Sequence, residues 1–275
     1  MISVASNIAS LNARRNLSKT HTNLSQSIER LSSGLRINRA ADDAAGLAVS
    51  ESMRTQLRGL QQAERNSQDA ISLIQTAEGG LQEVTNVLSR MRELAIQAAN
   101  EGTMDSTQRG YLHQEFDLLE SELNRIVNVT EYNGQALIDG TVSGGISFQI
   151  GMRNSDNDRI SVALQSVTAT SLGLNDEALS TASQAQAAIS ALDAALTTVN
   201  TQRGTLGATQ NRLEMTISNL LNMEENLSAA DSRIRDADIA EESAKLSRAQ
   251  ILEQAGTSVL AQANQLPQSV LSLIG

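Results

Sequence analysis

The sequence predicts a mainly α protein built from long antiparallel coiled-coil helices, with one small β-hairpin region. Three observations predict this fold class. Apolar residues recur at heptad spacing over much of the 275-residue chain, aromatic residues make up only 1%, and strand-like alternation is confined to one central stretch. Because a compact core of this size normally uses more aromatic rings, aliphatic side chains have to supply the packing, which suits long helices.

The N-terminal part carries a heptad pattern, and the next two helices are expected at 44–99 and 105–129. In the first of these two, apolar residues recur every three or four positions from Ile74 to Ala98. In the second, Leu112, Phe116 and Leu119 begin a shorter pattern of the same kind. Both segments therefore predict helices with one apolar face.

The β-hairpin region is expected at 130–166. It contains the turn pairs Asn133-Gly134, Asp139-Gly140 and Gly144-Gly145. Apolar residues alternate with polar ones on both sides of a polar loop at 154–158; these apolar residues are Ile146, Phe148 and Ile150, then Ile160, Val162 and Leu164.

A further long helix is expected at 182–230, and the C-terminal segment holds the most regular heptad. Together with the N-terminal pattern it predicts a terminal core seam, where the two ends of the chain pack on each other. The terminal core seam comprises Leu24, Ile28, Leu31, Leu35, Ala249, Leu252, Val259, Ala263, Leu266, Val270 and Leu273. Asp238, which stands three residues before Glu241, has the spacing of an N-terminal capping box for this last helix.

Two charged segments lie at matching distances from the two chain ends, which predicts an antiparallel hairpin of helices with a joint on each strand. This inter-domain joint comprises Arg36, Arg39, Asp42, Asp43, Asp231, Arg233, Arg235 and Asp236. Arginine–aspartate ion pairs across the joint are expected, each worth about 0–1 kcal/mol if exposed. The expected domains are an inner one, 1–43 with 232–275, and an outer one, 44–231.

Composition and motifs argue against several functional classes. A net charge of −10 disfavours nucleic-acid binding, and the absence of cysteine excludes disulfides and thiol chemistry. The uncharged segment 254–275 contains too many amides to span a membrane, and the N-terminus does not resemble a secretory signal. The run at 154–158 lacks the glycine and glutamate of a calcium loop. No catalytic constellation and no cofactor site is found, so we expect a protein that is not an enzyme.

Four stretches carry a close resemblance to a known family. They are LSSGLRINRAADDAAGLAVSE, NSQDAISLIQTAEGGLQEV, RMRELAIQAAN and ANQLPQSVLSLIG. They resemble the N- and C-terminal signatures of bacterial flagellin, in a short two-domain form without a large variable insert. The chain also lacks the HExxH peptidase motif that some flagellins carry in that insert.

The resemblance implies a self-polymerising structural subunit of the extracellular flagellar filament, used in motility. The implied partners are the chain itself, the flagellar export apparatus with its chaperone, and the hook-junction and cap proteins. Two alternatives stay open: a hook–filament junction protein with the same end signatures, and a cytoplasmic coiled-coil binding module, which would form a discrete oligomer.

One exposed patch is expected from the same resemblance. Arg90, Leu94 and Gln97 have i, i+4, i+7 spacing, and with Glu115 they match positions that form the surface recognised by the innate immune receptor TLR5 in some flagellins. The same face is expected to pack against a neighbouring subunit in a filament. The two roles are compatible, since only the free monomer would expose the patch.

The terminal segments are expected to fold on assembly. Their apolar stripe is narrow, contains no aromatic residue and has few charged neighbours. The burial of such a stripe offsets only part of the conformational entropy lost by about 25 ordered residues, at about 1.5 kcal/mol each. Packing against several neighbouring copies would supply the remainder.

Overall fold

The computed structural model describes residues 7–175 and 177–274, with side chains as far as residue 265. Its internal contacts divide the chain into two compact units. The first unit comprises Met1–Leu57 and Glu225–Gly275, and the second unit comprises Arg58–Glu224. The expected domain boundaries at 43 and 232 stay a prediction.

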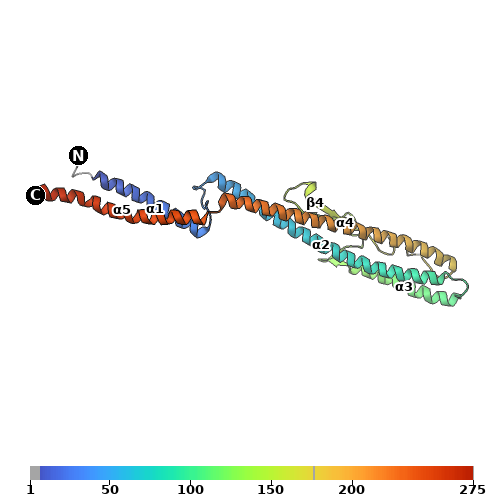
Figure 1. The fold of residues 1–275 in the computed structure, drawn as a ribbon. Coiled ribbons are helices and arrows are strands. Elements are labelled where there is room, and N and C mark those ends of the chain that lie inside the picture. Colours follow the sequence, from blue (N-terminus) through green and yellow to red (C-terminus); the bar gives the residue numbers. More distant parts are fainter. Residues whose placement is uncertain (1–6, 176, 275) are drawn as a thin grey trace. The chain divides into compact units, whose positions relative to one another are not determined.

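The first unit is dominated by two helices from opposite ends of the chain. Helix α1 (Ile8–Ser33) lies beside helix α5 (Ile239–Ile274), as Figure 1 shows. Helix α1 is capped at its C-terminal end by Gly34, whose φ of 72° is favoured only for glycine. Half of the capping box predicted at Asp238 is present: its carboxylate accepts from the backbone N–H of Ala240 at 2.9 Å and of Glu241 at 3.1 Å. The Glu241 carboxylate, which would complete the box, pairs instead with Lys245 at 2.9 Å.

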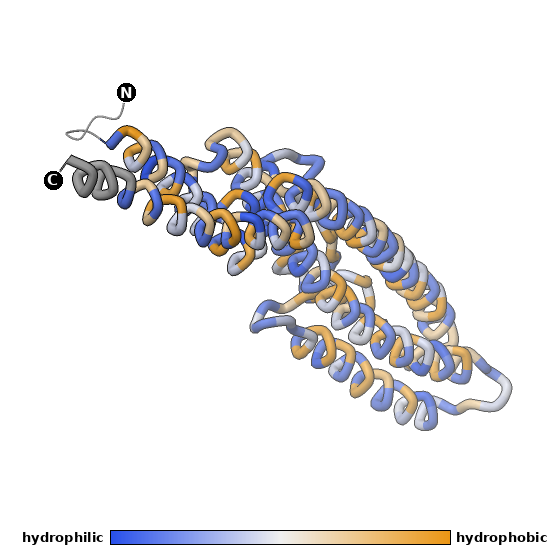
Figure 2. The backbone as a smooth tube through the Cα atoms, turned by 60° about the vertical axis from the view of Figure 1, so that its left-hand side comes forward, coloured by the Kyte–Doolittle hydropathy of each residue, from blue (hydrophilic) through white to orange (hydrophobic). Residues whose placement is uncertain are grey.

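The second unit is a bundle of helices around an aliphatic core. Helix α3 (Ser106–Val129) packs with parts of α2 (Ala44–Ala98) and α4 (Ala182–Arg235). The tube in Figure 2 shows the hydrophobic residues recurring along each helix, in agreement with the predicted periodicity. The fully buried side chains include Leu81, Leu88, Phe116, Leu123, Leu192 and Val199. The predicted fold class, long helices with a small β region, is confirmed.

The predicted β-hairpin is formed by β3 (Ile146–Gln149) and β4 (Arg159–Val162), which pair antiparallel with Phe148 opposite Ile160. A short 3-10 helix, Asp156–Asp158, lies in the polar loop between them. The alternation reports burial correctly on β4, where Ile160 and Val162 are buried and the intervening residues are exposed.

The structure contains a second pair of strands, of which the sequence predicted only the turn between them. Strands β1 (Glu131–Tyr132) and β2 (Gln135–Ala136) flank Asn133 and Gly134, whose φ values are 53° and 76°. Positive φ at both central residues is typical of a type I′ turn, which Asn-Gly favours.

Adjacent glycines on α2 provide a test of the packing in the second unit. A Cβ at Gly80 would lie 2.6 Å from Thr130 Oγ1 and 2.7 Å from its Cγ2, whereas a Cβ at Gly79 meets nothing within 4 Å. We expect Gly80→Ala to destabilise the protein by about 1–3 kcal/mol through overpacking, and Gly79→Ala to stabilise it by about 0.5–1 kcal/mol through helix propensity. Thermal unfolding of the two variants checks this pair, and a stabilising Gly80→Ala would contradict it.

Candidate functional site

The contact between α1 and α5 uses a face that differs from the predicted terminal core seam. On α1 a set of half-buried or buried positions recurs with heptad spacing; it comprises Ser10, Ala13, Leu17, Thr20, Leu24, Ser27 and Leu31. On α5 the corresponding positions are Glu242, Leu246, Ala249, Glu253, Gly256, Leu260 and Ala263. Leu17 packs closely on α5, since a Cβ at Gly256 would lie 3.1 Å from Leu17 Cδ1. Many contact positions are therefore small or polar.

Three residues of the predicted terminal core seam are not covered by this contact, although Leu252 and Val259 border it. Ile28 is 51% exposed, Leu252 51% and Val259 55%. Of the other members, Ala249 and Ala263 are buried, and Leu24, Leu31 and Leu35 are half-buried. Leu266, Val270 and Leu273 lie outside the residues whose side chains are described.

The correction has a simple geometric reason. The apolar residues of α5 cover an arc wider than the strip that one neighbouring helix can bury. Helix α1 covers the side of this arc with Ala249 and Ala263, and the side with Leu252 and Val259 stays about half exposed. A single helix pair therefore leaves large aliphatic side chains in solvent.

A buried polar cluster joins α1 to α5, and the sequence analysis did not single it out. Ser27 and Glu242 are each 5% exposed, and the Ser27 hydroxyl donates to Glu242 Oε1 at 2.7 Å. Lys245 Nζ lies 3.4 Å from Glu242 Oε2, and Arg30 Nη1 lies 3.9 Å from it. The signal was present in the spacing, since Glu242 stands seven residues before Ala249 and Ser27 three after Leu24. A buried polar pair of this kind fixes the register of two helices.

The cluster makes the pairing of α1 with α5 sensitive to acid. Burial raises the pKa of Glu242, but Ser27, Lys245 and Arg30 together outweigh it and hold the pKa below the ordinary value of 4.5. A carboxyl with a lowered pKa stabilises the fold above its unfolded-state pKa, and this contribution is lost as the pH falls through the folded-state value.

We therefore expect acid to destabilise the first unit, with Glu242 responsible for part of the loss. Circular dichroism during thermal unfolding of the polymer at pH 7 and pH 3 measures it, because the pairing of α1 with α5 is expected to be stable in the polymer. Glu242→Gln should reduce the difference between the two pH values, whereas the exposed control Glu225→Gln should leave it unchanged. An identical pH dependence in Glu242→Gln and the wild type would contradict the assignment.

At the predicted joint, the two segments of the chain contact each other through their backbones. Leu35 and Asp236 form an isolated antiparallel bridge, and the N–H of Arg36 donates to the carbonyl of Arg235 at 2.6 Å. The N–H of Ala237 donates to the carbonyl of Gly34 at 3.0 Å. The two segments that the charge pattern matched are therefore adjacent in the first unit.

The prediction of arginine–aspartate ion pairs across the joint was wrong. No such pair occurs among the described residues. Arg39 pairs instead with Glu29 at 2.8 Å, and Arg235 with Glu51 at 3.0 Å. The Arg36 guanidinium donates to the carbonyl of Ile234, with Nε at 3.1 Å. Among the described residues, the Arg233 side chain forms no hydrogen bond or ion pair.

The joint aspartates accept hydrogen bonds from backbone N–H groups and serine hydroxyls. Asp42 accepts from the backbone N–H of Asn38 and Arg39, and the Arg39 hydrogen bond contributes most to holding its pKa below the ordinary value. Asp43 accepts from the N–H of Gly46 at 2.9 Å, near the start of α2. The other two accept from serine hydroxyls: Asp231 from Ser50 at 2.5 Å, and Asp236 from Ser232 at 2.6 Å.

The predicted receptor-like patch is only partly formed on the surface. Arg90 donates to Glu115 Oε1 through Nη2 at 2.7 Å and to Glu93 Oε2 through Nη1 at 3.0 Å. The hydrogen bond to Glu115 is the main cause that raises the pKa of Arg90. Gln97 is exposed, beside a surface depression at the start of α3. Leu94 is 1% exposed, so its inclusion in an exposed patch was wrong; it packs in the core of the second unit because α2 is covered there by its neighbours.

The described residues contain neither a candidate metal site nor a candidate membrane-spanning helix. No group of three or more His, Asp or Glu side chains there could hold a metal ion. No described helix combines the length and hydropathy needed to cross a membrane.

Comparison with known proteins places the arrangement in a family. The helical N-terminal region of bacterial flagellin matches residues 4–143, and the helical C-terminal region matches residues 189–274. The chain is 49% identical over 268 residues to a flagellin of Halalkalibacterium halodurans and 45% identical over 300 residues to a flagellin of Bacillus subtilis, with 98% of both chains covered in each case. The crystal structure of Bacillus cereus flagellin matches with a TM-score of 0.50 and 32% identity, covering 61% of this chain and 94% of that one. The chain belongs to the bacterial flagellin family.

Proposed function

We propose that this flagellin is a structural subunit of the bacterial flagellar filament, in which copies pack on one another through the uncovered apolar faces of α1 and α5. The observation that carries this mode of packing is that large aliphatic residues of α1 and α5 stay exposed even when the two helices are paired with each other. These residues are Ile8, Leu11, Ile28, Ile239, Ile251, Leu252 and Val259, each more than half exposed. Soluble proteins rarely leave so much apolar surface free unless a partner covers it.

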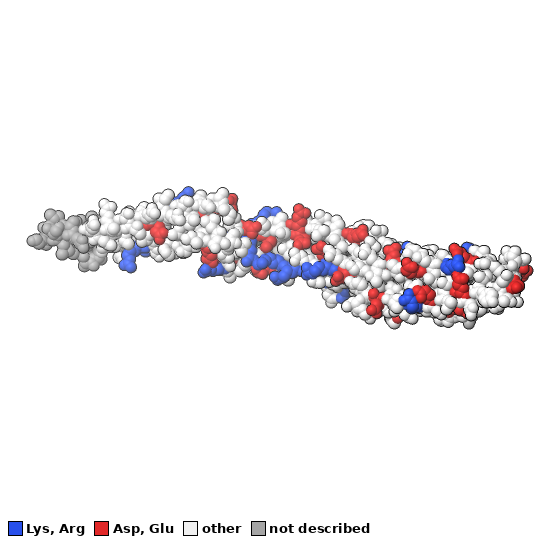
Figure 3. Space-filling view, turned by 90° about the horizontal axis from the view of Figure 1, so that it is seen from below, with Lys and Arg blue, Asp and Glu red and all other residues white. Residues whose placement is uncertain are grey.

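The distribution of charge supports the same packing. The first unit contains eleven basic and eleven acidic residues, whereas the second contains ten basic and twenty acidic ones. The whole net charge of −10 therefore lies on the second unit. On the face shown in Figure 3, acidic side chains are spread over the surface of the second unit. Copies of a unit without net charge can be crowded together with little electrostatic repulsion, while an acidic outer unit remains solvated.

Electron microscopy of the polymerised protein tests the proposal against the two alternatives. A heterologous contact that does not close on itself gives open-ended helical filaments. A cytoplasmic coiled-coil module would instead give a discrete dimer or tetramer, and a hook–filament junction protein would give short assemblies with few copies. Discrete particles at all concentrations would contradict a filament subunit.

The partners and location follow from the family and are part of the proposal. The subunit is extracellular in the flagellum, and it reaches the filament through the flagellar export apparatus with an export chaperone on its C-terminal segment. The filament that the subunits form joins the hook-junction proteins at one end and the cap at the other. The chaperone would cover the apolar residues of α5 before export, and neighbouring copies would cover the same residues after assembly.

A second role, recognition of the monomer by TLR5, is supported by the exposed ion pair of Arg90 with Glu115 next to Gln97. We expect Arg90→Ala to weaken monomer binding to the receptor ectodomain by about tenfold or more, as removal of an interface arginine commonly does. Arg125→Ala is the matched control, because Arg125 forms a similar exposed pair with Glu122 on α3. Surface plasmon resonance with all three proteins measures the effect, and equal binding by Arg90→Ala and the wild type would remove the receptor proposal.

A further inference from the structure

An asparagine is followed by glycine or serine at three places in the chain, Asn66-Ser67, Asn133-Gly134 and Asn154-Ser155. At such places the backbone nitrogen of the second residue can attack the carboxamide of the asparagine, because no bulky side chain shields that nitrogen. The attack requires an asparagine side chain that is free to turn and a backbone that can rotate. The three places differ in both respects.

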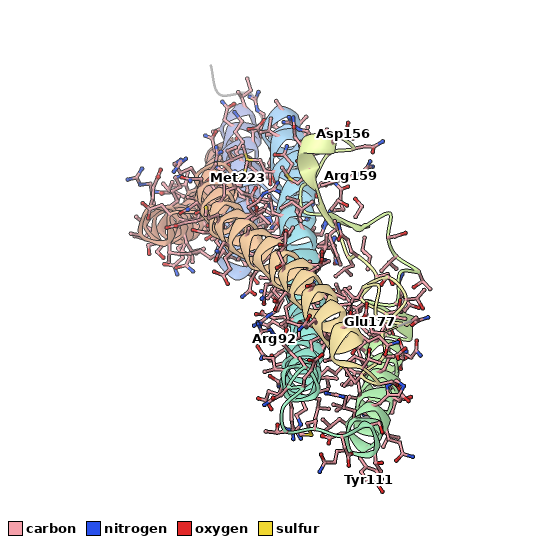
Figure 4. All side chains as sticks on the ribbon, turned by 90° about the vertical axis from the view of Figure 1, so that its right-hand side faces the viewer. Arg92, Tyr111, Asp156, Arg159, Glu177 and Met223 are labelled. Atoms are coloured by element: carbon pink, nitrogen blue, oxygen red, sulfur yellow. The ribbon has the colours of Figure 1, made fainter. Side chains whose placement is uncertain are left out.

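Two of the three asparagine side chains are held by hydrogen bonds. Asn66 lies within α2, where its Nδ2 donates to the carbonyl of Gln149 at 2.8 Å and its Oδ1 accepts from Gln62 at 2.9 Å. Asn154 is exposed, but its Oδ1 accepts from Arg159 Nη2 at 2.5 Å. Figure 4 shows Arg159 on the β3–β4 hairpin, whose loop contains Asn154. Each of these hydrogen bonds has to break before the carboxamide can turn toward the next backbone nitrogen.

The third asparagine, Asn133, lies in the open turn between β1 and β2. Asn133 and Gly134 are both exposed, and the Asn133 side chain forms no hydrogen bond with the described residues. A Cβ at Gly134 would meet nothing within 4 Å, so the space around the attacking nitrogen is open. The flanking strands are only two residues long, and so short a pair opens locally at little cost.

We propose that Asn133 is the first site of spontaneous deamidation in this chain, while hydrogen bonds protect Asn66 and Asn154. The Gly134 nitrogen loses its proton to water or hydroxide and bonds to Cγ of Asn133. The bond from Cγ to Nδ2 breaks, and ammonia leaves with a proton taken from water. Water then opens the resulting five-membered succinimide: addition at Cγ gives aspartate, and addition at the main-chain carbonyl carbon gives isoaspartate. Since the reaction needs one chain and water alone, the inference does not rest on the proposed function.

The two products differ in their effect on the turn. Aspartate tolerates positive φ as asparagine does, so it keeps the type I′ turn and adds one negative charge. Isoaspartate routes the backbone through its side-chain carbon and lengthens it by one methylene, so the register that pairs Tyr132 with Gln135 is lost. Because Tyr132 packs against the core of the second unit, isoaspartate loosens the edge of that core. Neither product reverts to asparagine, and the modified fraction grows with the age of the chain.

Ageing of the purified full-length protein in weakly alkaline buffer tests the proposal. Peptides are prepared under acidic conditions, which add little further deamidation, and are resolved by mass spectrometry. The rate at each asparagine in the native protein is divided by the rate in the same protein unfolded in guanidinium, which removes the effect of the local sequence. We expect folding to slow the reaction at Asn133 less than about threefold, and at Asn66 and Asn154 at least about tenfold. A methyltransferase that recognises isoaspartate should label the aged native protein at residue 133.

A variant that releases one of the protected asparagines provides the second measurement. Arg159→Ala removes the hydrogen bond to Asn154 and should speed deamidation there about fivefold or more, with the rate at Asn133 unchanged. The matched control is Arg153→Ala, which removes an exposed arginine of the same loop that does not contact the Asn154 side chain. Equal slowing by folding at all three asparagines, or a native rate that is highest at Asn66 or Asn154, would overturn the assignment. An unchanged rate at Asn154 in Arg159→Ala would overturn the protection by hydrogen bonds.

Discussion

The double variant Leu252→Asp with Val259→Asp is expected to raise the critical concentration for polymerisation at least about 100-fold. Both side chains are about half exposed on α5, at the edge of its contact with α1. Completing the burial of two such side chains contributes about 1 kcal/mol each, and an unpaired carboxylate placed in the same interface costs several more. A 100-fold change corresponds to about 2.7 kcal/mol, so the expected loss exceeds it. Sedimentation of polymer over a range of protein concentrations measures the effect.

The matched control for this variant is Gln250→Asp with Gln254→Asp. These two exposed residues lie on the same helix, and they introduce the same charges and the same helix propensity on its polar side. Their critical concentration should stay within about threefold of the wild type. Equal effects of the two double variants would mean that added charge, and not the loss of an apolar contact, prevents assembly.

The second large effect is expected in the core of the second unit. Phe116 is fully buried on α3, so Phe116→Ala removes a ring from a close-packed interior and should destabilise the unit by about 3–5 kcal/mol. For a unit of this size each kcal/mol lowers the melting temperature by about 2–4 °C, which gives a fall of about 6–20 °C. Thermal unfolding of the monomer, followed by circular dichroism, measures it.

Tyr111→Ala serves as the control because it removes an aromatic ring of similar size from the same helix. Tyr111 is 68% exposed, so its removal should change the melting temperature of the monomer by only a few degrees. A comparable loss in both variants would show that the aromatic ring stabilises α3 itself and not the core around Phe116.

The sequence predicted the helices well because heptad spacing reports which residues share a face. It predicted the β3–β4 hairpin for the same reason, through alternation at period two. It could not decide which part of a wide apolar arc a neighbouring helix covers. Ala249 and Leu252 are only three residues apart and both fit a seam, yet the first is buried and the second is half exposed.

The polar contacts were harder to predict than the apolar ones. Arg39 and Asp42 suggested ion pairs across the joint, but Asp42 accepts from nearby backbone N–H groups, and Arg39 reaches Glu29. A carboxylate close to a turn finds backbone donors at little entropic cost, which competes with a long-range ion pair. The placement of Leu94 failed for a related reason, since i, i+4, i+7 spacing alone does not fix which residues of a face remain outside the core.

Amide hydrogen exchange of α1 and α5, compared between monomer and polymer, tests most directly whether other copies complete the packing of these helices. Mass spectrometry resolves peptides from residues 8–33 and 239–265, with residues 81–98 of the second unit as an internal reference. The account predicts fast exchange of both terminal helices in the monomer, slowing at least about 100-fold in the polymer, while the reference changes little. Terminal helices that are protected equally in the monomer and in the polymer would contradict it.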